Sequence, residues 1–319
     1  MPFALVRRAG RAAALLLLLA PAAARALAAQ QPASQAASAA PAAAGAEIGT
    51  VVVAHGGGAD WNAQVEAVVK EVRLPGPVAV SFLMGPGAKA HRFQDVVQEL
   101  MWRGAKEVVV VPMLVSSHSG HYDQIRYLAR QLDTLGSTMM HHLHMAGIDR
   151  APAGIPMRLT PAMDDAPQIA EVLAARARAL AKAPSKQALF IVGHGPNAAE
   201  DYAAWMSNLR RVADTVRART GFRSVLVDLV RDDAPAPVRA EAVARVRELV
   251  RLQHELTGRE VVVVPVLVST GTVSKEKLPK DLAGLPMVYT GEALLPHPGM
   301  ARWIEARVRE AAATVAGAS

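Results

Sequence analysis

The sequence predicts an α/β protein made of two tandem domains, each with a mostly parallel four-stranded sheet flanked by helices. Its 319 residues suit two domains better than one. The apolar run at 107–115 shows no alternation of polar and apolar residues, which is typical of parallel strands buried on both faces. Nearly the same letters, EVVVVP, any residue, then LVS, return at 260–269. One half is therefore predicted to be a duplicate of the other.

The first half alternates apolar runs with segments of helical spacing. Four valines at helical spacing indicate the first helix, at 62–72. Gly104 follows the next helix, in the position where helices often end on glycine. The stretch 136–154 shows neither pattern and is interpreted as a long connection. The expected strands are 50–54, 78–83, 107–115 and 157–159, and the expected helices are 62–72, 91–103, 121–135 and 166–182.

The second half repeats this order. His194-Gly195 follows its first strand as His55-Gly56 follows the first strand of the chain, and Pro286-Met287 repeats Pro156-Met157. Landmarks in the same order favour duplication of one unit. The domains are predicted at 47–183 and 184–319, with second-half strands at 188–192, 224–229, 260–268 and 287–290, and helices at 199–219, 237–257 and 298–313.

Residues 1–29 have the features of a cleaved signal peptide. Three arginines precede a leucine-rich segment at 12–20, and Ala26-Leu27-Ala28 supplies a small-x-small cleavage site. An uncleaved membrane anchor is the alternative, but the apolar segment is short and Pro21 interrupts it. We expect a periplasmic or secreted protein, in which residues 30–46, rich in Ala, Gln, Ser and Pro, form a flexible linker.

Charge and composition exclude several functions. The formal net charge is +7, but four arginines precede the first acidic residue, Glu47, and without them it is +3. That balance lacks the strongly basic surface typical of nucleic-acid binding. The chain has no cysteine, which excludes disulfides, thiolate metal sites and cysteine nucleophiles. No G-x-x-x-x-G-K-[ST] motif occurs, so a P-loop for a nucleotide is absent.

Histidines follow two strands of the predicted first sheet. His55 comes directly after the first strand, and His118 and His121 come after the third, just past Ser116 and Ser117. Ligands of parallel sheets bind at the carboxyl ends of the strands, so these groups are expected at one rim. Neutral imidazole can bind a divalent ion or accept a proton. The pattern predicts metal or proton chemistry in the first half.

Two other features have competing interpretations. The segment His55-Gly56-Gly57-Gly58 matches the oxyanion-hole segment of α/β-hydrolases, but the chain has no G-x-S-x-G nucleophile motif. Residues 139–145 combine histidines with methionines, which suit copper or cobalt. The preferred interpretation there is a surface loop whose methionines pack inward, while His141, His142 and His144 face water.

An apolar strand running into His-Gly, then strand-Pro-x-Leu-x-Ser-x-x-x-Gly-His, resembles the CbiX/SirB family of class II chelatases. The resemblance spans nearly all of the chain after residue 46, and 51–130 carries it best. It implies a chelatase-like fold in each half and insertion of cobalt or iron into sirohydrochlorin. In that family the active histidines come from these two motifs, which implies His55 and His121 as metal ligands and proton acceptors here. We further predict His118 as an auxiliary metal ligand, and Ser116, Ser117, Gly56 and Gly57 as contacts of the bound tetrapyrrole.

The implied partners are a tetrapyrrole and a divalent metal ion, Co²⁺ first, with Fe²⁺ or Ni²⁺ as alternatives. No nucleotide or nucleic acid is required, and no stable membrane insertion is expected after signal cleavage. Many family members carry a glutamate after the second strand, where this chain has Met84. The second half keeps His194 but has Ser274 where His121 would align and Gly271 where His118 would.

Two hypotheses follow from these differences. The first is a chelatase whose active site lies in the first half. The second is a non-catalytic periplasmic protein that binds a metal or a tetrapyrrole on the same scaffold. The role of His194 and the oligomeric state stay open at this point.

Overall fold

The computed structural model describes residues 47–316, which belong to one compact unit, 41–319. The predicted signal peptide at 1–29 and the predicted linker at 30–46 lie outside the described residues and stay predictions. Across the described residues, no helix combines the length and the apolar character that a membrane crossing requires.

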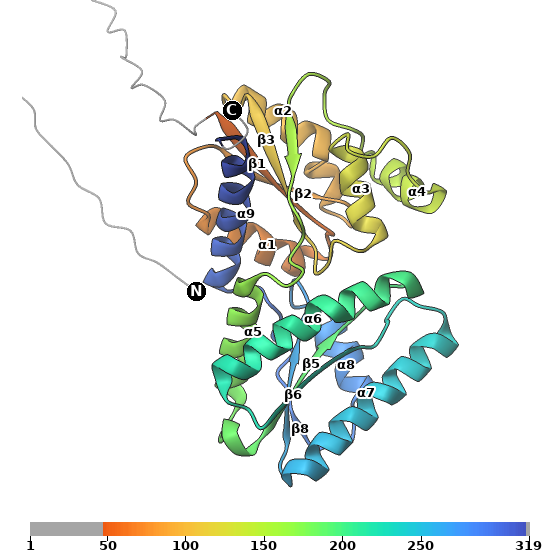
Figure 1. Cartoon of the computed structure of the whole chain (residues 1–319). Helices are drawn as coiled ribbons and strands as arrows, with labels where there is room; N and C mark the ends of the chain where they lie inside the picture. The colour runs from red at the N-terminus through yellow and green to blue at the C-terminus, as the bar shows by residue number, and fades with distance from the viewer. Residues whose placement is uncertain (1–46, 317–319) are drawn as a thin grey trace, which may run out of the picture. The chain divides into compact units, whose positions relative to one another are not determined.

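The first half is built on a four-stranded parallel sheet with helices around it (Figure 1). Its strands are β1 (Ile48–Ala54), β2 (Val78–Phe82), β3 (Glu107–Met113) and β4 (Met157–Leu159), in the order β2-β1-β3-β4. Its helices are α1 (Ala59–Glu71), α2 (Phe93–Trp102), α3 (Gly120–Leu128), α4 (Ser137–Ala146) and α5 (Pro167–Leu180).

The second half repeats the sheet in the equivalent order β6-β5-β7-β8, again all parallel. Its strands are β5 (Ala188–Gly193), β6 (Ser224–Leu229), β7 (Val261–Pro265) and β8 (Met287–Val288). Its helices are α6 (Ala199–Thr220), α7 (Ala236–Thr257), α8 (Leu278–Asp281), which a π-helical turn (Val273–Lys277) precedes, and α9 (Pro298–Ala316). The predicted fold class, two tandem α/β units with parallel four-stranded sheets, is confirmed.

The central strands are buried on both faces. Residues 51–54 of β1 and 108–111 of β3 are inaccessible to solvent, which explains why their sequences are continuous valine runs. β1 pairs with β3 in a register that places Ala54 beside Met113, so both strands end at the same level of the sheet.

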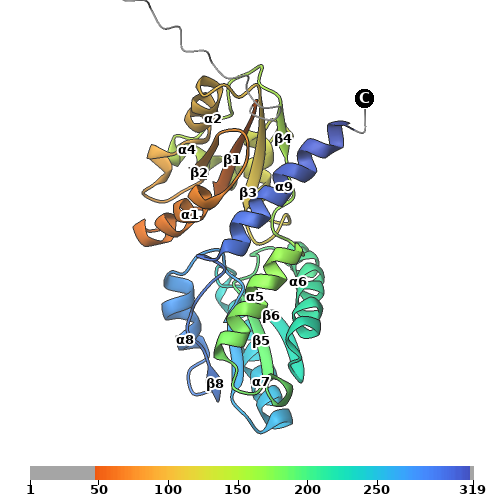
Figure 2. The ribbon, with the colours of Figure 1, turned by 90° about the vertical axis from the view of Figure 1, so that its left-hand side faces the viewer.

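The two halves exchange their last helices. Helix α5, the last helix of the first half, packs against α6 and β7, whereas α9, the last helix of the chain, packs against α1 and β3 (Figures 1 and 2). The Glu305 carboxylate of α9 accepts a hydrogen bond from the backbone N–H of Arg73, just past the end of α1, at 2.8 Å. The boundary predicted between 183 and 184 follows the sequence repeat and stays a prediction. In the fold, each closing helix packs against the sheet of the other repeat.

Two segments differ from the sequence prediction. The helix expected at 121–135 ends at Leu128, and Arg130 adopts a left-handed conformation with φ 59°. The stretch interpreted as a connection contains α4, a helix bounded by Gly136 and by Gly147, whose φ of 67° ends it. Helical spacing was hard to recognise there because Leu143 is the one buried residue of α4, and methionines and histidines occupy the positions around it.

Replacing Trp303 tests the helix exchange. This side chain of α9 is fully buried in the core that both halves share, so Trp303→Ala is expected to lower the free energy of unfolding by about 3–5 kcal/mol. Trp102, which is 79% exposed, provides the matched control, and Trp102→Ala should change stability by less than about 0.5 kcal/mol. Urea denaturation measures both, and equal effects would contradict the shared core.

Candidate metal centre

His55 leaves the end of β1 in a tight turn. Gly56 has φ +90°, and a Cβ on it would lie 2.1 Å from the backbone oxygen of Met84, so only glycine fits there. The backbone N–H of Met84 donates to the His55 carbonyl at 2.9 Å. The Nδ1 of His55 lies 2.8 Å from the Gly56 carbonyl oxygen, which can only accept, so Nδ1 carries the proton and Nε2 keeps a lone pair.

His121 lies in the first turn of α3, which the Ser119 hydroxyl caps by accepting from the Tyr122 N–H. Its Nδ1 is 2.8 Å from Oε1 of Gln124, and the Gln124 amide nitrogen donates to the Met139 carbonyl at 2.7 Å. That second bond fixes the amide orientation, so Oε1 must accept from Nδ1–H. Nε2 of His121 is thereby also left with its lone pair.

The two imidazoles meet edge to face. Their ring centroids are 4.6 Å apart and the ring planes are inclined by 85°. Burial lowers the pKa of His55, and burial together with the neighbouring His55 ring lowers the pKa of His121 to about 4. Both rings are therefore neutral at pH 7 while each stays partly accessible to solvent. Neutral imidazoles with fixed Nδ1–H groups can bind a divalent ion through Nε2 without first losing a proton.

The second half contributes a third imidazole, His194, at the end of β5. Its Nδ1 lies 2.8 Å from the Gly195 carbonyl oxygen, the same arrangement that His55 makes with Gly56. The His194 ring stacks edge to face on Trp205 of α6, with centroids 5.3 Å apart. A positive charge on His194 would lower the pKa of His121, which places His194 near the pair. The repeated His-Gly dipeptide was the sequence signal for this residue.

Met84 and Asp232 occupy equivalent places in the two halves. The Asp232 N–H donates to the His194 carbonyl at 2.9 Å, as the Met84 N–H does to His55. The next residue, Asp233, is exposed and has no hydrogen bond or ion pair to any residue in the described part of the chain. Its negative charge raises the pKa values of His55 and His194, opposing the larger effect of burial. The second half thus supplies a carboxylate whose charge acts on the histidines of the site.

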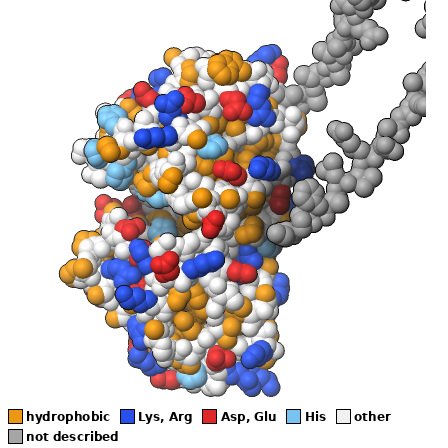
Figure 3. Space-filling model, turned by 180° about the vertical axis from the view of Figure 1, so that it is seen from behind, with side chains coloured by type: hydrophobic (Ala, Val, Ile, Leu, Met, Phe, Trp, Pro, Cys, Tyr) orange, Lys and Arg blue, Asp and Glu red, His pale blue; other side chains and the backbone are white. Residues whose placement is uncertain are grey.

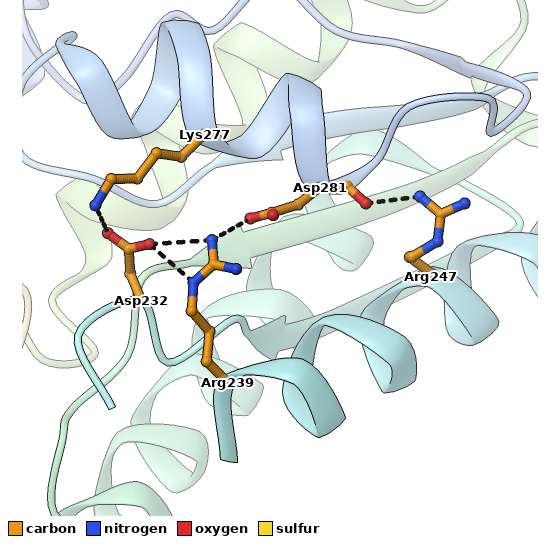
Figure 4. Close-up of polar contacts among 5 residues, drawn as sticks. All are labelled: Asp232, Arg239, Arg247, Lys277 and Asp281. Atoms are coloured by element: carbon orange, nitrogen blue, oxygen red, sulfur yellow. Dashed lines mark hydrogen bonds and ion pairs between the residues drawn. The ribbon is translucent and has the colours of Figure 1, made fainter. Parts of the chain in front are cut away.

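Ion pairs occupy the corresponding region of the second half (Figure 4). Asp232 accepts from Lys277 at 2.7 Å and from Arg239 at 3.3 Å, and Arg239 also pairs with Asp281 at 2.7 Å. Arg247 donates to the backbone carbonyl of Asp281, which ties α7 to the end of α8. The Asp232 carboxylate is therefore fully engaged and cannot serve as a free metal ligand.

Ser274 takes the place that His121 has in the first half. It is fully buried, and its hydroxyl exchanges hydrogen bonds with the backbone of Gly271. The second copy therefore has no imidazole pair, although it keeps the strand and the turn.

The other predicted site residues hold the loop after β3. Ser117 donates its hydroxyl to Asp164 at 2.6 Å, and the Ser116 hydroxyl accepts from the His118 N–H at 3.1 Å. His118 is exposed, and its carbonyl accepts from Trp205 Nε1 at 2.6 Å. No contact among the described residues joins the His118 ring to His55 or His121.

Of the predicted glycine contacts, Gly56 forms the turn after β1, and Gly57 donates its N–H to Asn62 Oδ1 at 2.8 Å. The structure thus brings His55 and His121 together and leaves His118 outside the pair. Binding of a tetrapyrrole by the two serines and two glycines stays a prediction.

The histidines of α4 divide between two sides of the helix. His141 and His144 are exposed, and Met145 is 70% exposed, whereas His142 is half-buried. Histidine side chains are visible over this helix in the upper left of Figure 3. The expectation that all three histidines face water and the methionines pack inward is therefore wrong for His142 and Met145. Across the described residues, no three His, Asp or Glu side chains are placed to hold one metal ion together.

Comparisons with known proteins show the family of the chain and its fold. The CbiX family model matches residues 49–180 and 188–311, one match for each half. SirB from Bacillus subtilis, solved with Fe³⁺, shares 15% identity at a TM-score of 0.55, covering 85% of this chain and 98% of that chain. CbiX, described as the terminal enzyme for biosynthesis of siroheme in denitrifying bacteria, shares 19% identity at a TM-score of 0.50. The match covers 82% of this chain and 99% of that chain.

A multi-domain protein from Deinococcus radiodurans with structural similarity to chelatases shares 18% identity at a TM-score of 0.53, covering 82% of this chain and 54% of that chain. A search of curated proteins finds no match. The predicted resemblance to the CbiX/SirB family is confirmed, and both halves take part in it.

The pKa of His121 can be tested in the metal-free protein. NMR titration of its ring should give a midpoint near pH 4, against about 6.5 in the denatured chain. Because the folded pKa is the lower one, the unfolded state binds more protons between these values, and stability should fall as pH drops from about 6.5 towards 4. A folded-state midpoint near 6.5 would contradict the buried pair.

Proposed function

Because the chain belongs to the CbiX family of chelatases, we propose that it is an exported chelatase that inserts a divalent ion of the cobalt or iron class into a sirohydrochlorin-like tetrapyrrole. The observation that carries this proposal is the His55–His121 pair, with both Nδ1 atoms fixed by hydrogen bonds and both Nε2 atoms left for a metal. His55 and His121 bind the ion, and His194 of the other half lies near the pair without joining them around one ion.

A site with only two imidazole ligands suits a metal ion that the protein must transfer to another ligand. Two protein ligands leave the remaining coordination positions to water or to the pyrrole nitrogens, so the ion can pass to the macrocycle by ligand exchange. The absence of a third carboxylate or imidazole around one point, within the described residues, supports loose binding of this kind. Imidazole is a suitable ligand for iron, cobalt and nickel alike. Which of Co²⁺, Fe²⁺ and Ni²⁺ is inserted therefore depends on the availability of each ion and on the macrocycle.

Insertion also releases two pyrrole protons. The lowered pKa values of His55 and His121 make these rings better metal ligands than proton stores at neutral pH. In the proposed reaction Nε2 of each ring accepts a pyrrole proton only after the ion has left it for the macrocycle, and then returns that proton to solvent. The exposed carboxylate of Asp233, whose charge acts on His55, favours both the cation and the departing protons.

A non-catalytic role is the second candidate, and Met84 is the observation that favours it. Met84 is hydrogen-bonded through its backbone to His55, so its side chain begins beside the metal ligands and offers no acid there. A periplasmic protein that only binds a metal ion or a tetrapyrrole would tolerate this residue. Such a protein would bind stoichiometrically and would not turn over.

Replacement of the pair separates these functions. With sirohydrochlorin and Co²⁺, the wild-type protein should accelerate the spectral conversion, and His55→Ala or His121→Ala should abolish it and weaken Co²⁺ binding by more than about 100-fold. His254, whose Nδ1 only contacts the Arg259 carbonyl at the end of α7, gives the control His254→Ala, which should behave as wild type. Tight wild-type binding without turnover would favour the non-catalytic binder, and unaltered Co²⁺ binding in both variants would exclude the proposed site.

Export rests on the sequence of residues 1–29. Expression of the full chain in a Gram-negative host, followed by fractionation and N-terminal sequencing, should yield a periplasmic product that begins near residue 29. A product that keeps Met1 and stays in the cytoplasm would refute export and leave the metal site unaffected.

A further inference from the structure

The inner side of α4 places two metal-ligating side chains close to the histidine pair. Met139 and His142 are three residues apart and therefore share one face of the helix. Both are half-buried, and Leu143 beside them is fully buried. His141 and His144 are exposed on the outer side of the same helix, whereas His142 is half-buried on its inner side.

His142 differs from the other histidines of the site in its hydrogen bonds. The Nδ1 atoms of His55, His121 and His194 each have a partner at 2.8 Å. The Nδ1 of His142 is buried and has no partner among the described residues. A buried polar atom without a partner costs about 1–3 kcal/mol, so a ligand that supplies one would be stabilised there. On a neutral ring protonated at Nε2, this atom presents a lone pair.

Helix α4 is fixed to the element that carries His121. The Gln124 side chain, which orients His121, also donates to the Met139 carbonyl at 2.7 Å. The thioether of Met139 packs against Gly120, where a Cβ would lie 3.0 Å from Sδ. A charge on the His142 ring would also lower the pKa values of both His55 and His121, as expected for neighbouring rings. One glutamine thus couples the position of α4 to that of the metal ligand.

We propose that Met139 and His142 form a capture position that receives the metal ion before the His55–His121 pair. This inference rests on the proposed function of that pair. The imidazole suits divalent ions such as Co²⁺, Ni²⁺ and Fe²⁺, and the softer thioether of Met139 is the weaker of the two ligands. Because Nδ1 of His142 is buried, the half-buried ring turns to bring this atom to the ion, where it replaces one water. Nε2 of His55 and His121 then replace His142 and further water. No electron is transferred and each ligand exchange leaves the charge of the ion unchanged.

Two stages agree with the arrangement of the donors. No three imidazoles or carboxylates among the described residues are placed around one point, so His142 cannot complete a three-ligand site with the pair as they stand. A ligand that acts before the pair needs only to lie next to it. The capture position should therefore control the rate at which the ion arrives more than the affinity with which the pair holds it.

Stopped-flow loading of the metal-free protein with Co²⁺, followed by the visible absorption of the bound ion, tests the proposal. His142→Ala should slow loading by about tenfold, and Met139→Leu, which keeps the apolar contact with Gly120, should slow it less. His144, exposed on the same helix, gives the matched control: His144→Ala should load as wild type. His142→Gln keeps the size and polarity of the side chain but ligates poorly, so it should be slow as well if folding is intact.

The outcomes separate the two proposals. Wild-type loading rates in both His142 variants would overturn the capture position, while loss of Co²⁺ binding in His55→Ala and His121→Ala would still support the pair. Equal slowing in His142→Ala and His144→Ala would also overturn it, because a general effect on α4 would then explain the result. Unaltered binding in the His55 and His121 variants would instead refute the proposed function itself.

Discussion

The parallel register between β1 and β3 is the constraint on which the site depends. Ala54 pairs with Met113, so both strands leave the sheet at one level, and the residues that follow them meet at one edge. From there a positive-φ glycine turns His55 back and a capped helix begins one residue before His121. A shift of this register by one residue would turn the buried valines to the other face of the sheet and separate the two rings.

The duplication preserves the scaffold while the chemistry differs. Both halves have the same strand order and the same His-Gly turn. The backbone N–H of Met84 donates to the His55 carbonyl, and that of Asp232 to the His194 carbonyl, each at 2.9 Å. In the second half Asp232, Arg239, Lys277 and Asp281 form ion pairs where a second metal site would lie. Removing one partner of such a pair would leave a buried charge uncompensated and destabilise the fold, so these ion pairs have a structural role. From the second half, the charges of His194 and Asp233 affect the pKa values of the first pair.

Much of this could be predicted from the sequence, and the rest depends on contacts between distant segments. Continuous valine runs predict parallel strands, and His55 and His121 follow from their places at strand ends. The exchange of α5 and α9 between the sheets was not predictable, because the amphipathic patterns of both helices fit either sheet. Gln124 and Asp233 also gave no signal. The amide of Gln124 is oriented by the Met139 carbonyl of α4, and the charge of Asp233 acts on His55 from the other half. Helix α4 was missed because it buries a single residue, Leu143, which leaves no apolar residues at helical spacing to indicate a helix.

The balance of charge at the site favours metal binding over proton storage. Burial keeps His55 and His121 neutral at pH 7, and the Nδ1 hydrogen bonds leave the Nε2 lone pairs available for coordination. Met84 offers no acid beside them, and Asp233 supplies negative charge from the other half instead. A carboxylate that stays outside the coordination sphere attracts a cation without holding it, because its charge acts at a distance through partly hydrated surroundings. A protein that must release its ion to another ligand benefits from that arrangement. The replacement of an adjacent acid by a more distant one therefore agrees better with transfer of a metal than with its storage.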